Sequence, residues 1–156
     1  MNTLILYATK YGAAREIAER ISGCIGGATL HDLKQGDVPA LAGFDCVIIG
    51  SSVYAGSIRK EAKAFLKQNA DSLRDKKLGL FLSGIGGSDE KKAFEDNFPP
   101  DILKAAKSAS FLGGIFDPKK ASAAERLIIK AVTKQSAYMN TVSDRKIQQF
   151  AEAVKE

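Results

Sequence analysis

Three segments of this sequence combine polar, small and aromatic residues that suit an anion and a flat ring. The first, residues 9–14, follows an apolar run and contains Thr9, Lys10 and Gly12. A hydroxyl and an ammonium group both donate hydrogen bonds to an anion, and glycine lets the backbone approach it closely. If a helix begins here, its free N–H groups and positive end converge on the same place, and phosphate is the natural occupant.

The first segment by itself is not a specific motif. It matches neither G-x-G-x-x-G nor G-x-x-x-x-G-K-[ST], which weakens a dinucleotide or nucleoside-triphosphate interpretation. The structural alternative is a turn whose threonine caps the following helix. The choice between a phosphate site and a simple helix-capping turn depends on the residues of the other two segments.

The second and third segments offer a stacking face and backbone polar groups. Tyr54 lies in the Ser- and Gly-rich residues 51–57 and is our stacking candidate, the alternative being a tyrosine that covers the sheet edge. Tyr11 either flanks the ligand or points to solvent. Residues 83–87 present main-chain donors to the edge of a ring, or form only a mobile turn. The predicted binding residues are Thr9, Lys10, Tyr11, Gly12, Ala13, Ala14, Ser51, Ser52, Val53, Tyr54, Ala55, Gly56, Ser83, Gly84, Gly86 and Gly87.

The strands and helices that must position these segments are indicated by two alternating patterns of apolar residues. Unbroken apolar runs are typical of parallel strands buried on both faces, and segments of period 3.6 between them predict helices. The expected strands are 3–8, 28–33, 46–50, 78–83 and 110–116, with a loop at 36–44. The expected helices are 13–24, 58–73, 88–97, 101–107, 122–134 and 143–155. Ser88, Ser122 and Ser143 are the expected caps of the helices that begin at them. The helix at 122–134 is expected to pack through its apolar stripe and keep a solvated basic side.

This alternation predicts an α/β fold with a three-layer, doubly wound, five-stranded parallel sheet, because right-handed crossovers place helices on both faces. The three candidate segments each follow a strand, so they should open on one rim, where ligands of such sheets bind.

Composition narrows the class of protein. The 156 residues, 45% hydrophobic and 26% charged, fit one globular domain over 1–156, expected to be cytoplasmic because the start of the chain has no signal-peptide pattern. The net charge of +5 is spread along the chain, so no nucleic-acid partner is expected. Cys24 and Cys46 lie apart from the single histidine, His31, so we expect buried thiols and no metal site.

The chain resembles flavodoxins, particularly the menaquinone-dependent protoporphyrinogen oxidases of flavodoxin fold. The resemblance is carried by TLILYATKYGAAREIAERI, by the more specific DCVIIGSSVYAGSIRKEAKAFLKQNADSL, and by FLGGIFDPKKASAAERLIIKAVTK, in that order. It implies strand order 2-1-3-4-5 and FMN as cofactor. Residues 9–14 would hold its phosphate, 51–57 and Tyr54 would line the isoalloxazine, and 83–87 would close the other side. The Ala55–Gly56 peptide matches the one that turns toward the reduced flavin.

Three functions remain open at this point. The first is an FMN protein that transfers electrons to a redox partner or acts as a flavin-dependent oxidoreductase, and we assign it no catalytic acid or base. The second is a quinone-coupled oxidase with peripheral membrane contact, indicated by the resemblance and the basic helix at 122–134. The third is a binding or regulatory module without cofactor, favoured by Ala13 and Ala14 in a loop poor in hydroxyls.

Overall fold

A parallel sheet forms the centre of the chain, whose computed structural model describes residues 1–86, 89–135 and 137–156. Its strands run in the order β2-β1-β3-β5-β6, which confirms the predicted order 2-1-3-4-5. They are β1 (Thr3–Ala8), β2 (Thr29–Asp32), β3 (Cys46–Tyr54), β5 (Lys77–Ser83) and β6 (Ser108–Phe111). A short strand, β4 (Ser57–Ile58), pairs antiparallel with the end of β3.

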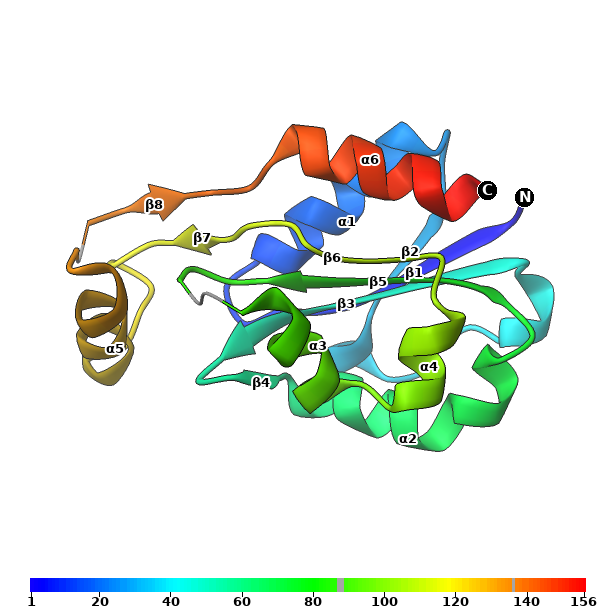
Figure 1. Cartoon of the computed structure of the whole chain (residues 1–156), viewed down its shortest axis with the longest axis horizontal. Helices are drawn as coiled ribbons and strands as arrows, with labels where there is room; N and C mark the ends of the chain where they lie inside the picture. The colour runs from blue at the N-terminus through cyan, green and yellow to red at the C-terminus, as the bar shows by residue number, and fades with distance from the viewer. Residues whose placement is uncertain (87–88, 136) are drawn as a thin grey trace.

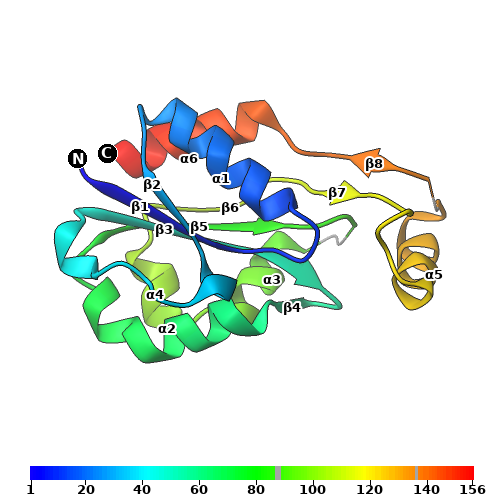
Figure 2. The same cartoon turned by 180° about the vertical axis from the view of Figure 1, so that it is seen from behind.

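Helices cover both faces of the sheet, as predicted (Figures 1 and 2). One face is covered by α1 (Ala13–Cys24) and α6 (Asp144–Lys155), and the other by α2 (Lys60–Leu73), α3 (Glu90–Asn97) and α4 (Pro100–Ala105). Both chain ends lie at the edge opposite the carboxyl ends of the strands (Figure 1). None of the helices that the structure describes is long and apolar enough to cross a membrane.

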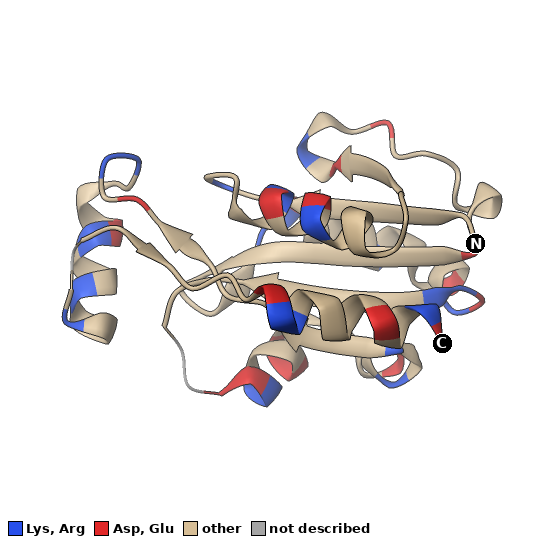
Figure 3. Cartoon of the chain, turned by 90° about the horizontal axis from the view of Figure 1, so that it is seen from above, with Lys and Arg blue, Asp and Glu red and all other residues tan. Residues whose placement is uncertain are grey.

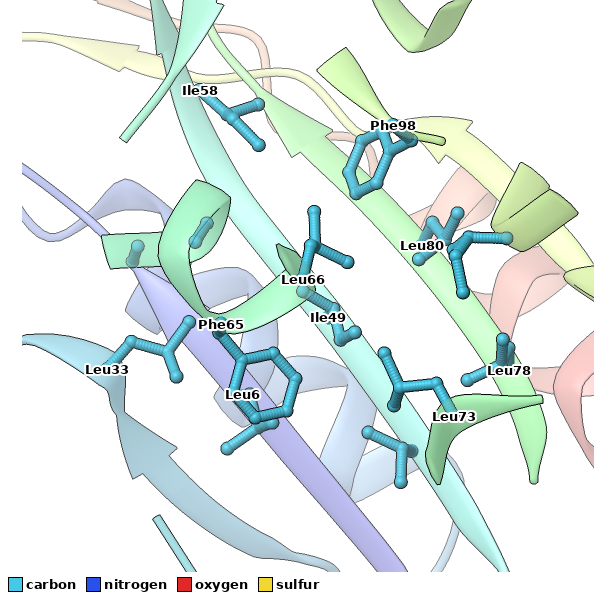
Figure 4. Packing of buried hydrophobic residues seen from close by; sticks show 14 of the residues in the cluster. Leu6, Leu33, Ile49, Ile58, Phe65, Leu66, Leu73, Leu78, Leu80 and Phe98 are labelled. Atoms are coloured by element: carbon cyan, nitrogen blue, oxygen red, sulfur yellow. The ribbon is translucent and has the colours of Figure 1, made fainter. Parts of the chain in front are cut away.

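The inner strands are apolar throughout because each of their faces is buried under a helix layer. Leu6, Ile49 and Leu80 point to one face, where Phe65 and Leu66 of α2 cover them (Figure 4). The neighbouring residues of the same strands point to the other face, where Ile17 and Ile21 of α1 and Phe150 of α6 pack. The unbroken apolar runs of the sequence therefore correspond to two hydrophobic clusters separated by one sheet.

Gly50 of β3 is required by this packing. Its register partner on β5 is Phe81, and a Cβ atom at position 50 would overlap the Phe81 ring. The ring is fully buried and meets Phe150 of α6 edge-to-face, with centroids 6.3 Å apart. Because position 50 has no side chain, the Phe81 ring fits beside it and packs the sheet against α6.

The carboxyl-terminal third of the chain departs from the predicted strand at 110–116. β6 ends at Phe111, and β7 (Ile115–Phe116) pairs antiparallel with β8 (Met139–Asn140) in a separate two-stranded sheet. The chain turns at Gly113, where φ is +90° and a Cβ atom would overlap Thr141. We call β7, β8 and the helix between them, α5 (Ala123–Thr133), the arm.

Helix α5 lies at the end of the arm, apart from the layers of the sheet (Figures 1 and 2). Its only buried residue in the described chain is Glu125, so the expectation that this helix packs through its apolar stripe is wrong. The separate ribbon carries it beyond the sheet edge, where no core surface reaches the stripe. Its predicted start is confirmed, since Ser122 and Glu125 form a reciprocal capping box.

Two smaller expectations also need correction or qualification. Cys46 is buried as expected, but Cys24 is exposed because it ends α1 beyond the part of the helix that the sheet covers. The predicted cap Ser88 lies outside the described residues, and the side chain of Asp89 caps α3 by accepting a hydrogen bond from the Lys92 N–H at 2.9 Å. At α6, the expected cap Ser143 is confirmed.

Candidate functional site

A pocket of about 700 Å³ opens where the carboxyl ends of β1, β3 and β5 face the arm. Its size is within the range of cofactor and ligand sites, and its place is where open α/β sheets bind ligands. The pocket brings the three candidate segments together. Predicted residues that line it are Thr9, Lys10, Tyr11, Ala13, Ser52, Val53, Tyr54, Ala55, Gly56, Ser83, Gly84 and Gly86.

Three other candidates that the structure describes do not line the pocket. Ala14 is fully buried in the core beneath α1. The Ser51 hydroxyl accepts a hydrogen bond from the Arg59 N–H at 3.0 Å and donates one to the Ser52 carbonyl at 2.9 Å. Gly12 contributes backbone conformation rather than contact surface. The remaining candidate, Gly87, lies outside the described residues.

The first loop prepares the start of α1 for an anion. Gly12 precedes the helix with φ +99°, and its N–H donates to the Thr9 hydroxyl oxygen at 2.9 Å. This bond closes a turn, but no side chain in the described chain caps α1 itself. The expected threonine turn is therefore present without a helix cap. The amides of the first helical turn are left for another acceptor.

Lys10 and Tyr11 of this loop both bind the carboxylate of Glu125, which reaches them from α5. The Lys10 Nζ lies 3.1 Å from Oε2, and the Tyr11 hydroxyl donates to Oε1. The same ammonium lies over two aromatic rings, 5.3 Å from the centroid of Tyr11 and 5.2 Å from that of Tyr54. Lys10 is thus held by a carboxylate and two ring faces.

Glu125 is held as a carboxylate although it is only 5% exposed. Burial raises its pKa, but hydrogen bonds from Tyr11, Ser122 and Lys10 lower that pKa to about 2. The sequence analysis did not select this residue. The S-x-x-E spacing of a capping box was available as a signal for a helix start, but not for a side chain that also crosses to a loop 115 residues earlier.

The second segment is a hairpin rather than a loop. Strand β3 continues to Tyr54 because β4 pairs with it, which leaves only Ala55 and Gly56 between the strands. Their φ angles are +50° and +80°, as a two-residue turn of the primed type requires. Asn97 of α3, which the sequence analysis also missed, donates to the Gly56 carbonyl at 3.0 Å and accepts from the Ile58 N–H at 3.0 Å.

Two serine hydroxyls at the pocket have no hydrogen-bond partner among the described residues. They are Ser52 Oγ and Ser83 Oγ, both buried, and their residues are register partners on β3 and β5. Buried polar groups in folded proteins are nearly always paired, and these two hydroxyls are placed to bond a polar group in the pocket.

A second part of the pocket lining is apolar. It is formed by Phe111, Ile115 and Phe116 before the helix of the arm, and by Ile128, Ile129 and Val132 on α5. One polar and one apolar side suit a flat heterocycle with a polar edge. No group of His, Cys, Asp and Glu side chains that could hold a metal ion occurs in the described ranges.

Comparison with known proteins places these features in a family. Residues 4–143 match the family model described as flavodoxin domain. A search of curated protein sequences found no match.

Several solved structures share the fold. A flavodoxin from Streptococcus pneumoniae is 18% identical with a TM-score of 0.67, covering 99% of this chain and 98% of its own. Oxidised flavodoxin 2 from Bacillus cereus is 19% identical with a TM-score of 0.64, covering 99% and 98%. A flavoprotein from Lactobacillus acidophilus, solved in complex with FMN, is 20% identical with a TM-score of 0.55, covering 70% and 92%.

Proposed function

This chain belongs to the flavodoxin domain family, and from that premise we propose that its pocket binds FMN non-covalently and that the protein transfers electrons to or from a redox partner. The observation that carries the proposal is the pair of buried hydroxyls of Ser52 and Ser83 at the carboxyl edge of the sheet, which have no hydrogen-bond partner among the described residues. They lie in the same pocket as an uncapped helix start and an aromatic face.

The proposed roles follow from the position of each group. The amides of the first turn of α1, with Thr9, hold the phosphate. Tyr54 and the hairpin at Ala55–Gly56 line the isoalloxazine, and Ser52, Ser83 and the backbone at Gly84 and Gly86 bind its polar edge. Val53 and Ala13 complete the walls. Ser51 and Ala14 support the site from the core without contact.

FMN, when bound, supplies the electron-transfer chemistry, and the residues of this chain bind it, orient it and exclude water. Asn97 fixes the Gly56 carbonyl and the Ile58 N–H, which leaves the Ala55–Gly56 peptide as the part of the hairpin free to reorient near a ligand. We propose that the protein works in the cytoplasm, either as a carrier or as an oxidoreductase with its own substrate.

Reconstitution with FMN tests the proposal directly. The protein should bind FMN with a shifted absorption spectrum and quenched fluorescence, and the double variant Thr9→Ala, Lys10→Met should weaken binding by about 10- to 100-fold, the loss of one or two hydrogen bonds to a charged group. A matched control, Thr29→Ala on the edge strand with Lys34→Met just after it, should leave the dissociation constant unchanged. No FMN binding at all would favour the cofactor-free module instead.

A second candidate, a quinone-coupled oxidase of the protoporphyrinogen oxidase type at the membrane surface, is favoured by exposed apolar side chains of the arm. Leu127 is 70% exposed, and Val132 and Tyr138 are each 57% exposed. Lys and Arg residues occur along the same helix (Figure 3). Apolar and basic residues together on an exposed helix are typical of segments that lie on an anionic lipid surface.

Liposome co-sedimentation measures this second candidate. We expect the protein to pellet with vesicles containing phosphatidylglycerol, and salt or Leu127→Ser to reduce the bound fraction severalfold. Ala70→Ser on α2, at the far side of the sheet, is the control and should sediment like the wild type. If the protein stays in the supernatant at low salt, peripheral membrane binding through the arm is wrong.

A further inference from the structure

Glu125 is the one charged residue among the buried positions of the described chain. Its carboxylate is hydrogen-bonded by Tyr11, by Lys10 at 3.1 Å and by the N–H of Ser122 at 3.0 Å. Two of these partners belong to the first loop and the third to the start of α5. A single carboxylate therefore fastens the arm to the loop where the proposed phosphate site lies.

We propose that Glu125 is a latch that sets the charge selectivity of the pocket: it holds Lys10, and a ligand phosphate has to take Lys10 from it, which loosens α5. This inference rests on the proposed function, because it needs an anion at the start of α1. It adds a role for a residue to which the proposed function assigns no contact with FMN.

The contacts of α5 show why one carboxylate can matter for the whole helix. Glu125 is its only buried residue in the described part, and the helix stands at the end of a two-stranded ribbon (Figure 1). Val132 of the helix also approaches the loop after β5, where its methyl would lie 2.6 Å from a Cβ atom at Gly86. Loss of Lys10 from the carboxylate leaves the helix held to the loop by the Tyr11 hydroxyl and by apolar contacts at the pocket mouth.

Lys10 is placed so that a ligand must move it. The ammonium lies over the ring of Tyr54 at 5.2 Å, so a flat ring stacked on this face of Tyr54 takes the space that Lys10 occupies. A phosphate at the uncapped start of α1 would bring a second anion within reach of the same flexible side chain. One ammonium then has two competing acceptors, Glu125 and the phosphate.

The variant Glu125→Gln separates charge from shape. Glutamine keeps the capping box and can still accept hydrogen bonds, but it is uncharged and cannot form an ion pair with Lys10. The measured quantity is the preference for FMN over riboflavin, the ratio of their dissociation constants, because riboflavin lacks the phosphate. We expect Glu125→Gln to raise this preference about fivefold, which corresponds to about 1 kcal/mol for a partly exposed ion pair.

The same substitution in a Lys10→Met background tests competition against a general electrostatic effect. Competition predicts a smaller gain when Lys10 is absent, whereas equal gains in the two backgrounds would mean that Glu125 acts only by its field and would overturn the latch. Glu19→Gln, which removes a carboxylate that is 53% exposed and paired with Arg15 on the outside of α1, is the control and should not change the preference.

Amide hydrogen exchange across residues 123–133 reports on the helix without any flavin. Exchange should be faster in Glu125→Gln than in wild type and unchanged in Glu19→Gln; equal rates in all three proteins would overturn the latch. If the wild type binds FMN and Glu125→Gln leaves the preference for FMN over riboflavin unchanged, only this inference is overturned. If the wild type binds neither flavin, the proposed function fails as well.

Discussion

Replacing Ser52 and Ser83 by alanine is expected to stabilise the flavin-free protein and to weaken FMN binding. Both hydroxyls are buried without a partner among the described residues, and a buried polar group without a hydrogen bond costs about 1 kcal/mol or more. Their removal should therefore raise the free energy of unfolding of the flavin-free protein by about 1 kcal/mol. In the complex the same hydroxyls are expected to bond the ring, so about 2 kcal/mol of binding is lost, roughly 30-fold in the dissociation constant.

Urea unfolding of the flavin-free protein and FMN titration measure the two effects in the same samples. Ser51→Ala is the matched control, because this neighbouring hydroxyl is satisfied by Arg59 and the Ser52 carbonyl. It should lower stability by about 1 kcal/mol and leave FMN affinity unchanged. If the Ser52 and Ser83 variants lose stability and keep full affinity, these hydroxyls support the sheet and do not meet a ligand.

Gly50→Ala should have the largest effect on stability of any single methyl addition in the inner strands. The new Cβ would overlap the Phe81 ring, which is fully buried against Phe150 and cannot move without displacing α6. Overpacking of a dense core costs about 1–3 kcal/mol where neighbours can adjust. Here the added Cβ atom overlaps the Phe81 ring itself. We therefore expect the free energy of unfolding to fall by more than about 3 kcal/mol, or the protein not to fold.

Phe81→Leu separates a clash from a general intolerance of strand β3. In the double variant with Gly50→Ala, the smaller side chain makes room for the methyl group, and urea unfolding should show recovery of part of the stability lost by Gly50→Ala. Gly43→Ala is the control, since a Cβ there meets no atom within 4 Å, and its effect should stay within about 0.5 kcal/mol. Equal losses at positions 43 and 50 would contradict the packing argument.

Sequence reasoning succeeded where the signal is local. The apolar runs of β1 and β5 predict buried strands because burial on both faces leaves no room for polar alternation, and these bounds agree with the structure within one residue. Ser122 and Ser143 were recognised as helix caps because a cap depends on residues three positions away. The carboxyl edge of the sheet could then be predicted as the rim that gathers the three segments.

Sequence reasoning failed where the answer depends on which segments pair or pack with one another. Strand β3 extends through Tyr54 only because Ser57 and Ile58 fold back on it. The predicted fifth strand is divided because Ile115 and Phe116 pair with residues beyond α5. A helical stripe of Ile and Val looks the same in sequence whether it covers a core or lines a pocket mouth, so the place of α5 was not predictable from period alone.

By itself, the sequence determined the order of strands and helices along the chain, the layers of the fold and the rim where the three candidate segments meet, because periodicity, glycine and caps act through the nearest turns of the backbone. Only the tertiary structure decided which side chains meet at that rim. It turned Ser51 into a backbone support and brought Glu125 to Lys10 across 115 residues. Such contacts depend on where strand pairing ends and on where the ribbon of β7 and β8 places α5. Neither can be predicted from the residues next to Ser51 or Glu125 in the chain.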